Sequence, residues 1–120
     1  MKMLAAIIGV ALTVGPANAD SLRWRFKNNT DHELAVKLYS SDRRNQNWQW
    51  PTSSTNWVLD PYDITRTYDI SCNYGEKICW GAWRTENTTI FYGVGHSLVQ
   101  PCTGCCFHCG QGDVPTQNLN

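Results

Sequence analysis

The chain has 120 residues, with 10 basic and 10 acidic side chains, six cysteines and six tryptophans. That length describes one small domain. The balanced charge disfavours nucleic-acid binding and attachment to anionic membrane surfaces, because both depend on long-range attraction between a basic protein and an anionic partner. Since 42% of the residues are hydrophobic and only 17% are charged, the chain can bury a core and is not a disordered polymer.

Residues 1–19 have the pattern of a cleaved signal peptide. A single lysine precedes an apolar run from Leu4 to Val14, which is too short to span a bilayer. Residues 17–19, Ala-Asn-Ala, provide the small side chains that signal peptidases accept. We therefore expect a mature chain that starts at Asp20 and is secreted or periplasmic, with no membrane span.

The rest of the chain predicts short β-strands and no long helix. Apolar side chains alternate with polar ones in stretches separated by turn-forming residues. These stretches predict antiparallel pairs of strands over residues 21–40, 57–72 and 78–95. About six or seven short strands at this spacing predict an all-β fold, either a small antiparallel sandwich or a partly closed barrel, with a disulfide-rich C-terminal loop.

The domain organisation is simple. Residues 20–112 are expected to form a single disulfide-stabilised β domain, because no linker divides them. Within the last strand pair, Gly81, Gly93 and Gly95 mark positions where strands bend or where two backbones approach closely. Residues 113–120 hold few side chains that could be buried, so they are predicted to be a flexible tail.

All six cysteines lie in the second half of the chain. They are Cys72, Cys79, Cys102, Cys105, Cys106 and Cys109. In an oxidising compartment an even number favours complete pairing, although sequence alone does not choose among the possible connectivities. Cys72 and Cys79 flank a turn-forming segment and could face each other across a hairpin. Cys105 and Cys106 are expected to bond to different partners, because a bond between neighbours strains the peptide that joins them.

The segment from Cys102 to Cys109 holds four of these cysteines and admits three interpretations. The favoured one is that disulfides join this loop to the sheets, with no metal ion and no cofactor. A metal-binding alternative notes that Cys-x-x-Cys is a chelating spacing for zinc, to which His96 or His108 could add a ligand. A redox alternative notes that His108, just before Cys109, could stabilise a reactive thiolate.

A resemblance to a known family also supports the redox alternative. The four residues from Cys106 to Cys109 resemble the Cys-Pro-His-Cys site of periplasmic thiol oxidants of the thioredoxin superfamily, which implies thiol–disulfide exchange through these two cysteines. The proline of that site is absent here. Gly110 and Gly112 would interrupt the helix that such a domain needs.

Tryptophans provide the second chemical signal. Trp48 and Trp50 are two positions apart, so in an extended segment both indoles point the same way. Asn47 and Gln49 beside them can donate and accept hydrogen bonds without charge. Sugar rings have apolar faces and hydroxyl rims, so aromatic rings among amides are typical of a saccharide-binding surface, and they also suit a protein-contact hot spot. The alternative is that both indoles belong to the core. Trp57 or Trp83 could be neighbours of this surface; of Trp80 and Trp83, one is expected to be buried and the other partly exposed.

No catalytic pattern stands out. His96 and Ser97 are adjacent, and adjacent side chains on a strand point apart, so they do not form a nucleophile and its base. The sequence favours a non-catalytic binding module whose partner is a protein or a cell-envelope glycan. The candidate ligand-binding residues are Asn47, Trp48, Gln49, Trp50 and Trp83.

Overall fold

The computed structural model describes residues 19–120. The predicted signal peptide lies outside these residues, apart from Ala19, which begins the first strand. Nine strands form in the described part: β1 (Ala19–Asn28), β2 (Leu34–Ser40), β3 (Gln49–Trp50), β4 (Trp57–Leu59), β5 (Arg66–Asn73), β6 (Lys77–Arg84), β7 (Phe91–Gly93), β8 (Cys106–His108) and β9 (Gln117–Leu119). One short 3-10 helix, η1 (Arg44–Gln46), precedes β3. A search of the described residues finds no helix with the length and hydropathy of a membrane span.

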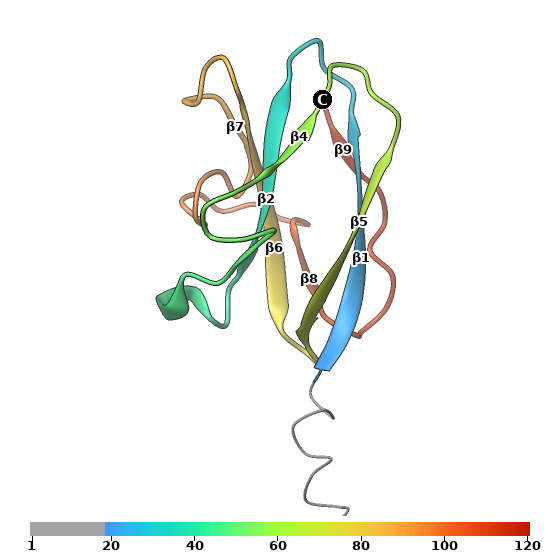
Figure 1. Ribbon diagram of the computed structural model, residues 1–120, viewed down its shortest axis with the longest axis vertical. Coiled ribbons are helices and arrows are strands. Elements are labelled where there is room, and N and C mark those ends of the chain that lie inside the picture. The colour runs from blue at the N-terminus through green and yellow to red at the C-terminus, as the bar shows by residue number, and fades with distance from the viewer. Residues whose placement is uncertain (1–18) are drawn as a thin grey trace, which may run out of the picture.

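The strands form two sheets that face each other (Figure 1). The three-stranded sheet has the order β5-β1-β9. In the six-stranded sheet, β2 and β6 are central; β3 and β4 pair with β2, and β7 and β8 pair with β6. The sheets do not close into a barrel. The predicted all-β fold is therefore confirmed, as a sandwich rather than a barrel, with nine strands in the described part instead of six or seven and with one parallel pair, β1 with β9.

The core lies between the two sheets and follows from period-two alternation. Trp24 and Phe26 of β1 are fully buried while their neighbours on the strand are more exposed. Trp24 packs edge-on against Phe107, and Phe26 packs edge-on against Trp80, with ring centroids 5.5 and 5.9 Å apart. Burial of aromatic rings of this size is the main favourable term in the stability of such a small domain.

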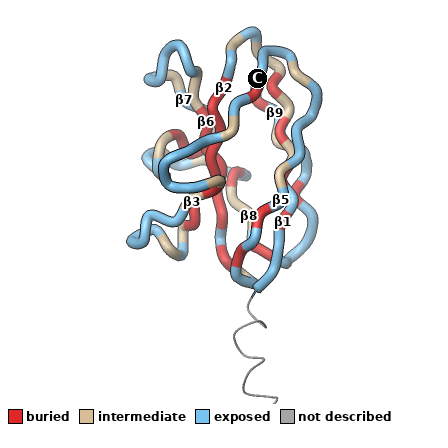
Figure 2. The backbone as a smooth tube through the Cα atoms, in the orientation of Figure 1, coloured by how far each residue is buried: buried red, intermediate tan, exposed pale blue. Residues whose placement is uncertain are grey.

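Strand β2 is buried on both faces. All seven of its residues are buried, and Figure 2 shows the buried backbone concentrated along β2 and β6. Val36 and Leu38 face the core, so Lys37 and Tyr39 point to the outer face, where loops cover them. A strand whose sequence alternates therefore has no solvent face.

Two of the three predicted strand pairs are wrong. β1 and β2 belong to different sheets, and β1 pairs instead with β5, Leu22 opposite Ile70. The chain crosses between the sheets after Asn28, whose buried side chain donates to the carbonyls of His32 and Asp60. β4 likewise pairs with β2 rather than β5. The pair over residues 78–95 is confirmed, with β6 and β7 antiparallel.

The flexible tail predicted for residues 113–120 is also wrong. β9 lies beside β1, and the N–H of Asn29 donates to the carbonyl of Leu119 at 2.8 Å. Val114 and Leu119 are each only 1% exposed. Both side chains belong to the hydrophobic core, so the domain extends beyond residue 112.

Three disulfides brace the fold: Cys72–Cys109, Cys79–Cys106 and Cys102–Cys105. The expectation that Cys105 and Cys106 have different partners is confirmed. The pairing of Cys72 with Cys79 is wrong, because β5 and β6 lie in different sheets. Several disulfides in so small a domain are typical of proteins that fold in an oxidising compartment outside the cytoplasm.

Candidate functional site

A groove of about 760 Å³ opens along one side of the sandwich, between the edge strand β5 and the segment around β3. We call it the tryptophan groove. Its walls come from residues 46–53, Trp57 and residues 69–71. Asn47, Trp48, Gln49 and Trp50 all line it, so four of the five candidate residues lie together.

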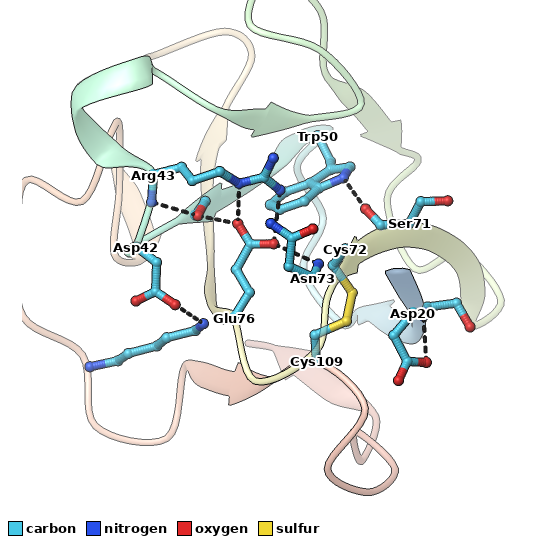
Figure 3. The surroundings of a disulfide bond; sticks show 12 residues. Asp20, Asp42, Arg43, Trp50, Ser71, Cys72, Asn73, Glu76 and Cys109 are labelled. Atoms are coloured by element: carbon cyan, nitrogen blue, oxygen red, sulfur yellow. Dashed lines mark hydrogen bonds and ion pairs between the residues drawn. A yellow bond between two sulfur atoms is a disulfide. The ribbon is translucent and has the colours of Figure 1, made fainter. Parts of the chain in front are cut away.

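The two indoles of the predicted pair have different environments. Trp50 is 7% exposed, pairs with Leu38 on β2, and donates its Nε1–H to the carbonyl of Ser71 at 3.0 Å (Figure 3). Trp48 is 44% exposed. The core interpretation therefore holds for Trp50, which joins the two sheets, while Trp48 presents its ring to solvent.

Arg43 holds Trp48 in place. Its guanidinium carbon lies 4.1 Å from the ring centroid of Trp48 and 5.9 Å from that of Trp50. The guanidinium also donates two hydrogen bonds to the Glu76 carboxylate, from Nε at 2.6 Å and from Nη2 at 2.8 Å (Figure 3). Such a bidentate pair fixes the plane of the guanidinium, and so fixes the cation over the indole.

Glu76 is a buried carboxylate, and both of its oxygens accept hydrogen bonds. It is 3% exposed and also accepts hydrogen bonds from the Asn73 N–H, at 3.0 Å, and from the Ser40 hydroxyl. Burial acts to raise the pKa of Glu76, but the hydrogen bonds it accepts, led by those from Arg43, outweigh burial and hold the pKa below its ordinary value. The carboxylate therefore stays ionised and keeps Arg43 paired at neutral pH.

Sequence reasoning missed Arg43 and Glu76. They are 33 positions apart, and charged residues beside turns are usually solvated. The only signal was that Glu76 follows Asn73 and Gly75 in a tight turn between two cysteines. Nothing in that pattern pointed to Arg43.

The other wall of the groove contains a second aromatic stack. Trp57 lies parallel to Tyr68 of β5, with ring centroids 4.2 Å apart and planes 14° from parallel, and it is partly exposed. Two of the lining residues are joined to each other: the Gln49 amide donates to the Asn47 side-chain oxygen at 2.5 Å. The groove thus combines two accessible indoles, Trp48 and Trp57, with uncharged amides that can donate and accept.

Trp83 does not line the tryptophan groove. It lies on the outer face of the six-stranded sheet, where its ring packs against His96 with centroids 4.1 Å apart. Asn47 and Gln49 border both places. Trp83 is therefore a neighbour of the groove rather than part of it.

The cysteine segment offers no free sulfur. All six cysteines are in disulfides, and within residues 19–120 there is no cluster of three or more His, Cys, Asp and Glu side chains placed to hold a metal ion. Cys106 and Cys109 belong to different disulfides, so the predicted redox pair does not form. The Cys-x-x-Cys bond that does form is Cys102–Cys105.

Comparison with known proteins adds no family to this description. The chain matches no protein-family model, no curated protein and no solved structure.

Proposed function

We propose that the protein is a non-catalytic, exported binding module that recognises a cell-envelope glycan in the tryptophan groove. The observation that carries the proposal is that Trp48 is both exposed and held in place by a neighbouring side chain. Arg43 covers one side of its indole, yet 44% of the residue is exposed, so a broad apolar surface is held rigid at the mouth of a groove. An exposed, immobilised aromatic ring loses little entropy on binding.

The chemistry of the groove suits a sugar. Trp48 and Trp57 supply apolar surfaces for the C–H faces of pyranose rings, and the amides of Asn47 and Gln49 match hydroxyl groups. The volume of about 760 Å³ lies within the range of roughly 300–1,000 Å³ that is usual for small-ligand sites. Export, expected from residues 1–19 and supported by the three disulfides, would place this groove among envelope polymers.

A protein partner in the same groove is the second candidate, and one observation favours it. The carbonyl of Ser71 faces the groove, where it accepts the Trp50 hydrogen bond. Along an antiparallel strand, alternate residues point their N–H and C=O groups to the same side, so Asp69 shares this orientation. β5 is an edge strand, and an extended peptide could pair with it.

Retention on purified envelope glycan tests the proposal. The protein is applied to insoluble envelope polymer before and after exhaustive protease treatment of that polymer. We expect retention on both, and about tenfold weaker retention for Trp48→Ala because one stacking surface is lost. Tyr74→Ala, which removes a ring that is 60% exposed but outside the groove, is the matched control and should bind normally.

Each other outcome argues against glycan recognition. Retention that disappears when the polymer is stripped of protein would favour the peptide-binding candidate. Equal retention of wild type and Trp48→Ala would remove the groove from the explanation.

A further inference from the structure

We propose that a second hollow, on the outer face of the six-stranded sheet, binds the carboxylate of an acidic sugar, so that the glycan recognised by this protein is an acidic one. The sugar assignment rests on the proposed function, whereas the anion assignment stands on the hollow itself. The hollow has a volume of about 330 Å³. Its walls include Lys37, Gln49, Trp83, His96 and residues 53–56, and we call it the lysine hollow.

Lys37 is the centre of the argument. It is only 7% exposed, because the segment between β3 and β4 covers it, and its Nζ donates to the carbonyl of Ser53 at 3.1 Å. An ammonium group carries three N–H donors, and this is the one hydrogen bond that it makes within residues 19–120. Two donors therefore remain for a ligand.

No anion of the protein balances this charge. None of the residues that line the hollow is acidic, and no ion pair in the described part of the chain includes Lys37. A buried cation without a counter-ion is unfavourable, and burial accordingly lowers the pKa of Lys37. An anionic oxygen group entering the hollow would meet a cation whose side chain is already largely buried and held by Ser53.

The opposite wall is rigid for a reason visible in the sequence. Gly81 pairs with Lys37 across β2 and β6, and a Cβ at that position would lie 2.0 Å from the carbonyl oxygen of Gly95. Only glycine lets the segment after β7 approach the sheet so closely. That approach brings His96 against Trp83, where Phe91 also meets the imidazole edge-on at 4.8 Å.

The balance of groups favours a sugar carboxylate over a phosphate. The hollow offers one lysine, an indole and an imidazole side by side, and the amide of Gln49, which matches a single negative charge on a ring with hydroxyl groups. Phosphate groups are usually met by several cations or by a bidentate arginine. The lysine hollow and the tryptophan groove also share Asn47, Gln49 and Ser53 as lining residues, so one polymer could occupy both.

Titration of isotope-labelled protein with small probes tests the hollow directly. The probes are D-glucuronate, D-glucose, acetate and inorganic phosphate, followed by NMR at the Lys37 side chain, the Ser53 amide and the Gln49 side-chain amide. At Lys37 we expect saturable shifts with glucuronate, none with glucose, and dissociation constants for acetate and phosphate several-fold above that for glucuronate. Because these shifts are measured on the wild-type protein, this part of the test does not depend on whether a variant folds.

Lys37→Met removes the charge and keeps most of the side-chain volume. Glucuronate binding should weaken at least about tenfold in this variant, because its carboxylate would lose the buried cation. Lys77→Met, a matched change at an exposed lysine on β6, should bind as the wild type does. Well-dispersed spectra for both variants confirm that they fold.

Three results would overturn the inference: no saturable shift at Lys37, unchanged binding in Lys37→Met, or acetate or phosphate binding as tightly as glucuronate. The last would reduce the hollow to a general anion site. Failure of the proposed function looks different. In that case Trp48→Ala would be retained normally on protein-free glycan, while glucuronate would still bind at Lys37.

Discussion

The cysteine segment, residues 102–109, and the tryptophan segment, residues 47–50, are held in the fold by opposite means. The first is joined covalently to both sheets, through Cys109 to β5 and through Cys106 to β6. The second is held by one short strand, an ion pair and a cation over an indole. The first segment therefore depends on covalent bonds, and the second depends on non-covalent contacts alone.

The two segments are nevertheless connected through a single turn. Glu76, which pairs with Arg43 beneath Trp48, accepts at its carbonyl a hydrogen bond from the Cys109 N–H at 2.9 Å. The Gly75 N–H in turn donates to the Cys109 carbonyl at 2.8 Å. The Cys72–Cys109 disulfide therefore braces the turn that positions the groove (Figure 3).

The largest effect is expected from removing that disulfide. Cys72→Ser with Cys109→Ser opens a link across 37 positions, and the entropy gained by the unfolded chain should lower the free energy of unfolding by about 4 kcal/mol. Urea unfolding followed by tryptophan fluorescence measures the loss.

The Cys102–Cys105 bond provides the control, since it spans only three positions. Cys102→Ser with Cys105→Ser should cost about 2 kcal/mol or less. An equal or larger loss would contradict the expectation that the Cys72–Cys109 bond stabilises the fold more than the short Cys102–Cys105 bond does. The redox alternative assigned exchange to Cys106 and Cys109, so this variant asks a separate question. If the wild type oxidises a reduced model dithiol and the variant does not, the Cys102–Cys105 bond has chemistry besides bracing.

Trp50→Ala is expected to have the next largest effect. The indole fills the side of the core at the groove, so its loss should lower the free energy of unfolding by about 3 kcal/mol. Trp50→Phe separates packing from hydrogen bonding, because it keeps a ring but removes the bond to Ser71; we expect a loss of about 1 kcal/mol beyond the change in volume. If Trp50→Ala leaves the free energy of unfolding nearly unchanged, then neither indole of the tryptophan segment contributes to the core.

Local patterns in the sequence predicted local structure well. The alternation of apolar and polar side chains predicted a strand where β1 forms, with Trp24 and Phe26 on its buried face. The strand pair predicted over residues 78–95 forms as β6 and β7. Gly81 was predicted to mark either a bend or a close approach, and the structure shows a close approach, to the backbone of Gly95.

Non-local features were beyond the sequence. Nothing near β1 indicates that it pairs with β5, more than forty positions away, instead of with β2. The alternation in β2 would place Lys37 in water, and only the loops folded over the outer face bury it. The prediction of a flexible tail failed because Val114 and Leu119 are few and far apart in the sequence, and only the folded core and the pairing of β9 with β1 bury them.

Glu76→Gln should have an intermediate effect. It leaves Arg43 without its carboxylate and should lower the free energy of unfolding by about 2 kcal/mol at pH 7. Because folding lowers the pKa of Glu76, the stability from this contact is fully present above the ordinary glutamate pKa of about 4.3 and is lost as the pH falls through the lower folded value.

A pH series of urea unfolding checks this prediction. Wild-type stability should fall below about pH 4, and the difference between wild type and Glu76→Gln should shrink there. Asp69→Asn is the control, since its pair with Arg23 has both side chains more than half exposed and should matter far less. A constant difference across the series would show that the effect of Glu76→Gln does not arise from its charge.

Trp48→Ala should have the smallest effect on stability and the largest on recognition. With 44% of the residue exposed, the variant should lose less than about 1 kcal/mol of unfolding free energy, most of it from the contact with Arg43. The same variant is expected to bind protein-free envelope glycan about tenfold more weakly. If Trp50→Ala loses more unfolding free energy and Trp48→Ala loses more glycan binding, then Trp50 serves the fold and Trp48 serves the ligand. A loss of several kcal/mol for Trp48→Ala would instead make Arg43, Glu76 and Trp48 part of the bracing, and the contrast with the cysteine segment would vanish.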